Sequence, residues 1–155
     1  MIKAGIFDVG GVLHKNTLFS SSDFLLDHAQ LSEEEFHEHY THKDVIEIIK
    51  KLKLQQISLA VLSNTIQEHA LYLTQKGIYD EFDELIFSYQ INMRKPDSQI
   101  YLVALQRIES EPSETFYVDD IQENVDAAIK LGMHGILFTS ADQLEKELKS
   151  LGVHV

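Results

Sequence analysis

FDVGGVL, the stretch from Phe7 to Leu13, decides how this chain folds. The apolar run Ala4 to Phe7 leads into a single carboxylate at Asp8 and then into the glycine pair Gly10 and Gly11. A short apolar run that ends at a turn signal is typical of a buried strand. Glycine lets the backbone turn sharply aside where the strand ends. The stretch therefore predicts a buried strand that delivers one acid to the edge of a sheet.

Similar apolar runs recur along the chain, and helical patterns separate them. The predicted strands are Ala4–Phe7, Ile57–Leu62, Glu84–Phe87, Thr115–Val118 and Ile136–Phe138. The predicted helices are Lys43–Leu52, Ile66–Lys76, a helix opened by Pro96 and Asp97 that carries Ile108, Glu123–Leu131 and Ala141–Leu151. This alternation predicts an α/β fold, with a parallel sheet that helices cover on both faces.

Length and composition limit the number of domains and the class of protein. The 155 residues, 44% hydrophobic and 25% charged, predict one globular domain over residues 1–155. No apolar run reaches the length of a membrane span and no signal pattern opens the chain, so we expect a cytoplasmic protein without membrane partners. The absence of cysteine excludes disulfides, thiolate zinc sites and a cysteine nucleophile. The net charge of -12 disfavours nucleic acid and favours a small ligand or a metal, whereas no pattern predicts the oligomeric state.

Polar residues follow four of the predicted strands, at the edge where open α/β sheets bind ligands. In chain order they are Asp8, the pair Ser63 and Asn64, Lys95, and the pair Asp119 and Asp120. Carboxylates that lie close together repel one another, and a hard divalent cation relieves this repulsion. Ligands that are all oxygen suit Mg²⁺. Because lysine and serine supply the charge and the donor that a phosphate needs, the set predicts phosphoryl chemistry.

Each of these residues also has an ordinary structural interpretation. An isolated Asp after a strand is more often a helix cap or a turn residue. Ser63 and Asn64 could cap the next helix, Asp120 could cap the helix that follows it, and Lys95 could be a solvated surface residue. Matching chemistry at four strand ends favours the functional interpretation.

Four segments at these positions resemble the motifs of the haloacid dehalogenase superfamily of hydrolases. FDVGGVL is similar to the first motif, VLSNT to the second, RKPD to the third, and FYVDDIQENVDAAIKLGMHGILF to the fourth. Each motif is weak alone, but four in order are specific, and the resemblance covers nearly the whole chain. It implies a Rossmann-like core and an Mg²⁺-dependent aspartyl nucleophile. With the full set of metal and phosphate residues, we expect an Mg²⁺-dependent phosphatase that acts on a small phosphomonoester.

The resemblance also implies a role for each residue. Asp8 is expected to attack phosphorus and form a phospho-aspartate. The implied ligands of Mg²⁺ are Asp8, the backbone carbonyl of Gly10, Asp119 and, directly or through water, Asp120. Ser63 and Lys95 are expected to hold the phosphoryl oxygens and stabilise the charge during transfer, with assistance from Asn64.

Gly10 departs from the usual pattern of the family's phosphatases, which carry a second Asp at this position as general acid and base. Losing such a group costs on the order of 10²–10⁴-fold in rate. We therefore expect a weak or specialised enzyme. The alternative is a catalytically silent protein that binds a metal, a phosphorylated ligand or a protein partner. His14 is a candidate replacement for the missing acid.

The segment 15–42 is a second departure, because it is shorter than the cap domain that many family members insert between the first two motifs. It has room for two short helices, and Ser32 and Glu35 are spaced as a capping box at the start of one of them. We expect a reduced helical cap, which leaves the site open to water and to large substrates.

Overall fold

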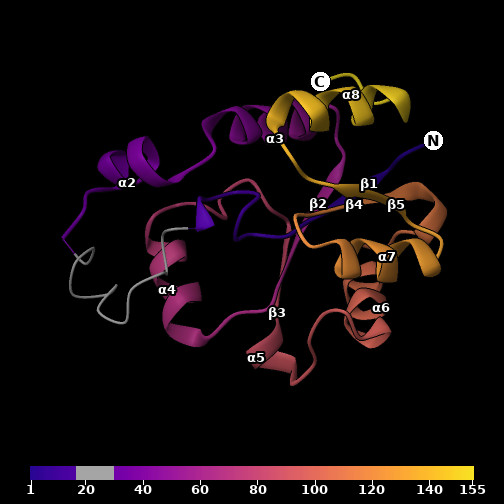
Figure 1. The fold of residues 1–155 in the computed structure, drawn as a ribbon, viewed down its shortest axis with the longest axis horizontal. Coiled ribbons are helices and arrows are strands. Elements are labelled where there is room, and N and C mark those ends of the chain that lie inside the picture. Colours follow the sequence, from indigo (N-terminus) through magenta and orange to yellow (C-terminus); the bar gives the residue numbers. More distant parts are fainter. Residues whose placement is uncertain (17–29) are drawn as a thin grey trace.

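The computed structural model describes residues 1–16 and 30–155, and a sheet of five parallel strands forms its centre. The strands are β1 (Ala4–Phe7), β2 (Ser58–Ser63), β3 (Glu84–Phe87), β4 (Thr115–Asp119) and β5 (His134–Leu137). Their order across the sheet is β3-β2-β1-β4-β5 (Figure 1). The chain moves outward from β1 to β3 and then returns to the other side of β1 for β4 and β5. The strand order therefore reverses between β1 and β4, which is the place where open α/β sheets bind ligands.

Helices cover both faces of the sheet. Their bounds are α2 (Glu33–Tyr40), α3 (Lys43–Leu54), α4 (Gln67–Gln75), α5 (Ser88–Ile91), α6 (Ser98–Arg107), α7 (Gln122–Lys130) and α8 (Ala141–Ser150). α3 and α8 pack together on one face, and α6 and α7 pack together on the other (Figure 1). Buried apolar side chains form a separate cluster on each face. The predicted Rossmann-like α/β architecture is confirmed.

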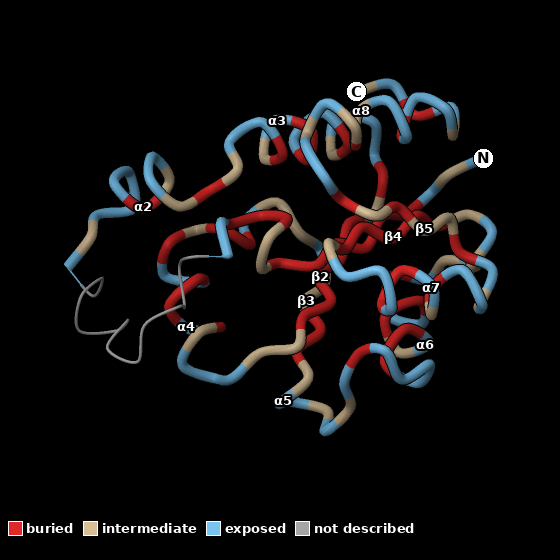
Figure 2. The backbone as a smooth tube through the Cα atoms, viewed as in Figure 1, coloured by how far each residue is buried: buried red, intermediate tan, exposed pale blue. Residues whose placement is uncertain are grey.

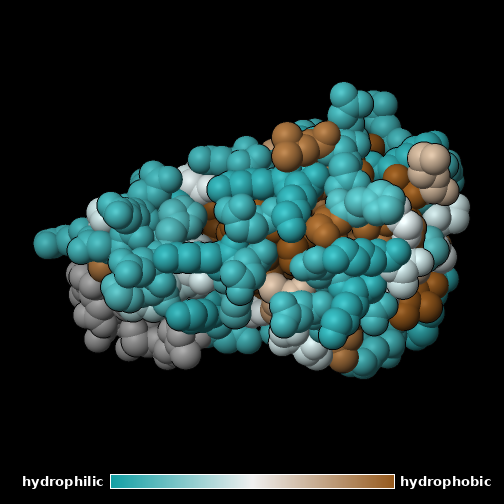
Figure 3. All heavy atoms as spheres, turned by 90° about the horizontal axis from the view of Figure 1, so that it is seen from above, coloured by the Kyte–Doolittle hydropathy of each residue, from teal (hydrophilic) through white to brown (hydrophobic). Residues whose placement is uncertain are grey.

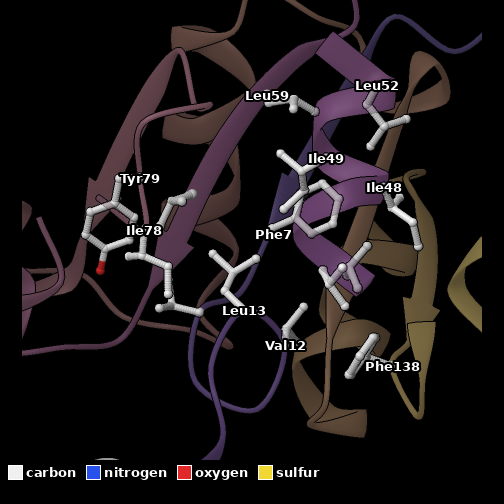
Figure 4. Packing of buried hydrophobic residues seen from close by; sticks show 14 of the residues in the cluster. Phe7, Val12, Leu13, Ile48, Ile49, Leu52, Leu59, Ile78, Tyr79 and Phe138 are labelled. Atoms are coloured by element: carbon white, nitrogen blue, oxygen red, sulfur yellow. The ribbon is translucent and has the colours of Figure 1, made fainter. Parts of the chain in front are cut away.

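The central strands are buried on both faces, which explains their continuous apolar sequence (Figure 2). The ring of Phe7 packs edge-on against that of Phe116, with centroids 5.6 Å apart, and lies near Leu13 and Ile49 (Figure 4). Gly5 is the register partner of Phe116, and a Cβ at Gly5 would lie 2.2 Å from the Phe116 ring. The central strand therefore contains a glycine because a neighbouring ring occupies the space of its side chain.

The cap-like segment 15–42 contains one helix, α2, within the described residues. Ser32 caps α2, because its hydroxyl accepts from the Glu35 amide while the Glu35 carboxylate accepts from the Ser32 amide. The predicted capping box is confirmed. Phe36 of α2 is fully buried, and its ring meets that of Tyr72 edge-on at 5.8 Å. Residues 17–29 of the predicted cap-like insert 15–42 lie outside the described residues, so the cap itself stays a prediction.

The end of α2 is joined to the loop that follows β1. The amide of Lys15 donates to the carbonyl of Tyr40 over 2.8 Å, and the amide of His42 donates to the carbonyl of Leu13 over 2.9 Å. These backbone bonds hold the chain that leads into α3 against the loop of the first motif.

The predicted strands and long helices agree with the structure to within two residues at either end. Two short elements were not predicted, namely α5 and a 3-10 turn at Pro112–Glu114, because three or four residues show no periodicity. In the part of the chain that the structure describes, no helix is both long and apolar enough to cross a membrane. The face seen in Figure 3 is mainly hydrophilic, with apolar atoms in small separate groups.

Candidate active site

Asp8 and Asp119 lie side by side at the carboxyl edge of the sheet. Phe7 of β1 is the register partner of Val118 of β4, so Asp8 and Asp119 are the next residues on two neighbouring strands. The Asp8 amide donates to the Val118 carbonyl over 2.8 Å and extends the ladder by one step. The backbone therefore places two carboxylates at the point where the strand order reverses.

Lys95 bridges these two carboxylates. Its Nζ lies 2.7 Å from Oδ1 of Asp8 and 2.8 Å from Oδ2 of Asp119, and the residue is only 3% exposed. Asn64 holds the backbone of Lys95, because the Lys95 amide donates to Asn64 Oδ1 over 2.8 Å and Asn64 Nδ2 donates to the Lys95 carbonyl over 3.0 Å. The interpretation of Lys95 as a solvated surface residue is wrong. Asn64 and Lys95, from two different motifs, form one unit.

The carboxylate of Asp119 is fully buried and accepts hydrogen bonds at both oxygens. Oδ1 accepts from the Ile121 amide over 2.9 Å. Oδ2 accepts from Lys95, from the Tyr117 hydroxyl and, over 3.1 Å, from Asn124 Nδ2. A buried charge needs donors of this kind in place of the water that it has lost.

The pKa of Asp8 is raised to about 6, chiefly because the carboxyl is buried. The Lys95 ammonium opposes this rise, and the negative charge of Asp119 adds to it. A carboxyl with this pKa is mainly ionised at neutral pH, so Asp8 can serve as a nucleophile or as a ligand.

Asp120 completes a cluster of three carboxylates. Asp8, Asp119 and Asp120 each offer an oxygen, and these oxygens all lie within 4.8 Å of one another. Asp120 accepts a hydrogen bond from Asn16 Nδ2 over 3.2 Å. The ammonium of Lys95 offsets only part of the charge of the three anions, and an all-oxygen donor set is what Mg²⁺ prefers. The residues present fit a magnesium ion.

The two glycines of the first motif differ in what the structure requires of them. Gly11 has a φ of +79°, and a Cβ there would lie 2.2 Å from Asp120 Oδ2. Gly10 lies outside the left-handed region, and its Cβ would meet nothing closer than 3.7 Å, from Asn16 Oδ1 and His14 Cε1. Gly11 is therefore needed for the approach of Asp120, whereas the position of Gly10 has room for a side chain.

A pocket of about 190 Å³ opens beside Gly10, and its walls include His14, Ser63 and Asn64. His14 is 3% exposed, and its Nδ1 lies 2.9 Å from the carbonyl oxygen of Lys15. Burial lowers the pKa of His14 to about 4. A larger pocket of about 380 Å³ lies among α2, α3 and the loop after α4, and no predicted site residue lines it.

The interpretation of Ser63, Asn64 and Asp120 as helix caps is wrong. The N-cap residues of α4 and α7 are Ile66 and Ile121, and no side chain caps either helix. Asp120 instead bonds to Asn16 from the loop after β1. The structure thus brings every predicted site residue to one edge of the sheet. It excludes the interpretation of these residues as helix caps.

The sequence patterns did not predict three residues that lie at the site. Tyr117 and Asn124 donate to Asp119, and Asn16 donates to Asp120. Tyr117 carried a usable signal, because residues two apart in a strand point to the same face and Tyr117 precedes Asp119 by two. No sequence pattern indicates Asn16, since 104 residues separate it from Asp120, to which it donates.

Comparison with known proteins assigns the family. The sequence profile of the haloacid dehalogenase-like hydrolases matches residues 8–138, from the acid after β1 to the residue after β5. The chain belongs to this family. It is 32% identical over 105 residues to a sesquiterpene phosphatase of Aspergillus oryzae, and the match covers 67% of this chain and 54% of that one. The chain spans about half or less of the length of the curated relatives that it matches.

Solved structures share the fold of this haloacid dehalogenase-like chain. A HAD phosphatase from Thermococcus onnurineus superposes with a TM-score of 0.74 at 19% identity, over 99% of this chain and 100% of that one. A HAD family enzyme from Bacteroides thetaiotaomicron, in complex with magnesium and inorganic phosphate, superposes with a TM-score of 0.68 at 18% identity, over 90% and 96% of the two chains.

Proposed function

We propose that this chain is an Mg²⁺-dependent phosphatase of small phosphomonoesters that acts through a phospho-aspartate on Asp8. The bridge of Lys95 between Asp8 and Asp119, at the edge where the strand order reverses, carries the proposal. Nucleophile, positive charge and the hydroxyl of Ser63 then lie at one edge of the sheet, as phosphoryl transfer requires. The phosphatase relative and the fold neighbour with magnesium and phosphate support this class of reaction. The net charge of -12 favours a small substrate over a polyanion.

In the proposed reaction, an oxygen of Asp8 forms a bond to phosphorus while the bond from phosphorus to the leaving oxygen breaks. The Lys95 ammonium and the Ser63 hydroxyl hold the phosphoryl oxygens, and Asn64 keeps the backbone of Lys95 in place. Water then attacks the phosphorus of the phospho-aspartate, which releases phosphate and restores the carboxylate. Bound Mg²⁺ would supply positive charge that offsets the charge of the phosphoryl group. Its proposed ligands are Asp8, the carbonyl of Gly10, Asp119 and Asp120.

Gly10 makes the enzyme weak or specialised in this proposal, because no side chain at that position moves a proton to the leaving oxygen. The same observation favours the second candidate, a catalytically silent family member that binds a metal, a phosphorylated ligand or a protein partner. His14 lines the same pocket as Gly10, but burial lowers its pKa to about 4, so it is mainly neutral at neutral pH and a poor proton donor.

Hydrolysis of an aryl phosphate with Mg²⁺ and with a chelator, compared between the wild type and Asp8→Asn, tests the proposal. Asn keeps the size of the side chain but removes the nucleophilic oxygen, so the rate should fall on the order of 10³-fold or more. Circular dichroism checks that the variant is folded. Activity that survives in Asp8→Asn would exclude the phospho-aspartate. A wild type that binds Mg²⁺ but is inert across a panel of phosphomonoesters would favour the silent protein.

A further inference from the structure

Tyr117 lies directly beneath the carboxylates, inside the sheet. It precedes Asp119 by two residues on β4, so both side chains point to the face that α6 and α7 cover. Its ring is fully buried and meets the ring of Tyr101 edge-on, with centroids 5.2 Å apart. The Lys95 Nζ lies 5.9 Å from the centroid of the Tyr117 ring. The phenol oxygen donates to Asp119 Oδ2.

The two carboxylate oxygens of Asp119 accept different numbers of hydrogen bonds. Among the residues that the structure describes, Oδ2 accepts from Lys95, Tyr117 and Asn124, whereas Oδ1 accepts from the Ile121 amide alone. A carboxylate oxygen has about two lone pairs, so Oδ2 is saturated and Oδ1 keeps capacity for a further partner. The donors at Oδ2 therefore select which oxygen of Asp119 is available.

The three donors at Oδ2 are not equivalent. Lys95 is shared with Asp8 and, in the proposed function, turns toward the phosphoryl group. Asn124 belongs to α7, outside the sheet. The Tyr117 hydroxyl belongs to the same strand as Asp119, and its ring is packed on all sides. A phenol carries its proton at neutral pH, so the hydroxyl remains a donor.

We propose that Tyr117 is a positioning residue, which holds Oδ2 of Asp119 inward and thereby presents Oδ1 to the metal ion. The inference rests on the proposed function only in assuming that Asp119 binds Mg²⁺. Groups that hold a metal ligand in this way typically change metal affinity by 10–100-fold when they are removed.

Tyr117→Phe removes the hydroxyl and keeps the ring. We expect the dissociation constant for Mg²⁺, measured by calorimetric titration of the metal-free protein, to rise about 10-fold. Tyr79→Phe is the matched control, because it also deletes a buried phenol, whose oxygen makes no hydrogen bond within the described part of the chain. The control should keep its Mg²⁺ affinity to within about twofold.

Two outcomes would overturn the inference: unchanged Mg²⁺ affinity in Tyr117→Phe, or equal weakening in both variants, which would indicate general loosening. If the wild type hydrolyses an aryl phosphate, Tyr117→Phe should also need more Mg²⁺ for half of its maximal rate while the rate at saturating Mg²⁺ is largely retained. A wild type that binds Mg²⁺ and hydrolyses nothing defeats the proposed function but leaves this inference standing.

A measurement on the wild type covers the case in which Tyr117→Phe fails to fold. The ¹³Cζ resonance of a tyrosine reports the hydrogen bond of its hydroxyl, and the resonances of Tyr117 and Tyr101 can be followed together in labelled protein. Mg²⁺ should shift the Tyr117 signal, with saturation at the concentrations seen by calorimetry, and should shift the Tyr101 signal less. A Tyr117 signal that stays fixed up to saturation would contradict the inference.

Discussion

On one side of Asp8 the carboxylate meets Lys95 and, through it, the buried carboxylate of Asp119. On the other side the chain passes through Gly10 into a pocket bordered by His14. The first flank is buried and charged, its groups are hydrogen-bonded to one another, and its donor set fits a metal ion. The second flank has space and a neutral imidazole. The difference shows that the groups proposed to position the phosphate and the place proposed for proton transfer lie on opposite sides of Asp8, so the two roles can be tested separately.

The strongest test of the Lys95 flank is Lys95→Met, which removes the charge and keeps much of the side-chain volume. Asp8 and Asp119 would then be two buried carboxylates without their shared cation. Breaking a buried ion pair on one side costs about 3–5 kcal/mol. We therefore expect the free energy of unfolding of the metal-free protein, measured with urea, to fall by about this amount.

Lys149→Met is the control for this comparison. Lys149 pairs with Glu145 at the surface of α8, where its side chain is 52% exposed. An exposed pair of this type contributes little to stability, because solvent screens it. Equal losses in the two variants would contradict the view that Lys95 holds the carboxylates together. Because Mg²⁺ offsets the same repulsion, it should restore more stability to Lys95→Met than it adds to the wild type.

Gly10→Asp adds a carboxylic acid beside the pocket that His14 borders. The position tolerates a side chain, because the Cβ would lie 3.7 Å from His14 Cε1 and from Asn16 Oδ1. A positioned acid and base should raise the Mg²⁺-dependent rate of aryl phosphate hydrolysis on the order of 10²-fold. Gly10→Asn has nearly the same shape and cannot transfer a proton. If the two variants have equal rates, proton transfer is not what limits this site.

Much of this site was predictable because its parts are local in sequence. Asp8 directly follows the apolar run of β1, Asp119 ends that of β4, and parallel strands bring such ends to one edge. Lys95 lies in the loop between α5 and α6, on the connection that follows β3. The pairing between them was not predictable. Whether Lys95 faces solvent or two carboxylates depends on Asn64, which holds its backbone from another loop. The spacing of Tyr117 and Asp119 indicates that both face the same side of the sheet, but it does not reveal that the Tyr117 hydroxyl bonds to the carboxylate.

As the pH falls, protonation of His14 and of Asp8 should change the stability of the protein in opposite directions. This is the smallest of the predicted effects. The pKa of His14 is lowered from 6.5 to about 4 by burial, so between these values the unfolded chain binds a proton that the folded protein does not. His14 therefore lowers stability as the pH falls through this window. The pKa of Asp8 is raised from 3.8 to about 6, so the folded protein binds the extra proton, and Asp8 raises stability as the pH falls below about 6.

His14→Gln separates the two contributions, because Gln does not titrate and its amide can still donate to the Lys15 carbonyl. Between pH 6.5 and pH 5 the wild type should lose about 2 kcal/mol of stability relative to His14→Gln, at roughly 1.4 kcal/mol per pH unit. Relative to Asp8→Asn, the wild type should gain about 1 kcal/mol of stability between pH 6 and pH 5. Urea unfolding at each pH in the presence of a chelator measures both, since a bound metal would change the titration of Asp8. Parallel pH profiles for the wild type and His14→Gln would mean that His14 is protonated as readily in the folded protein as in the unfolded chain, and the pocket beside Gly10 would then hold a cation at neutral to mildly acidic pH.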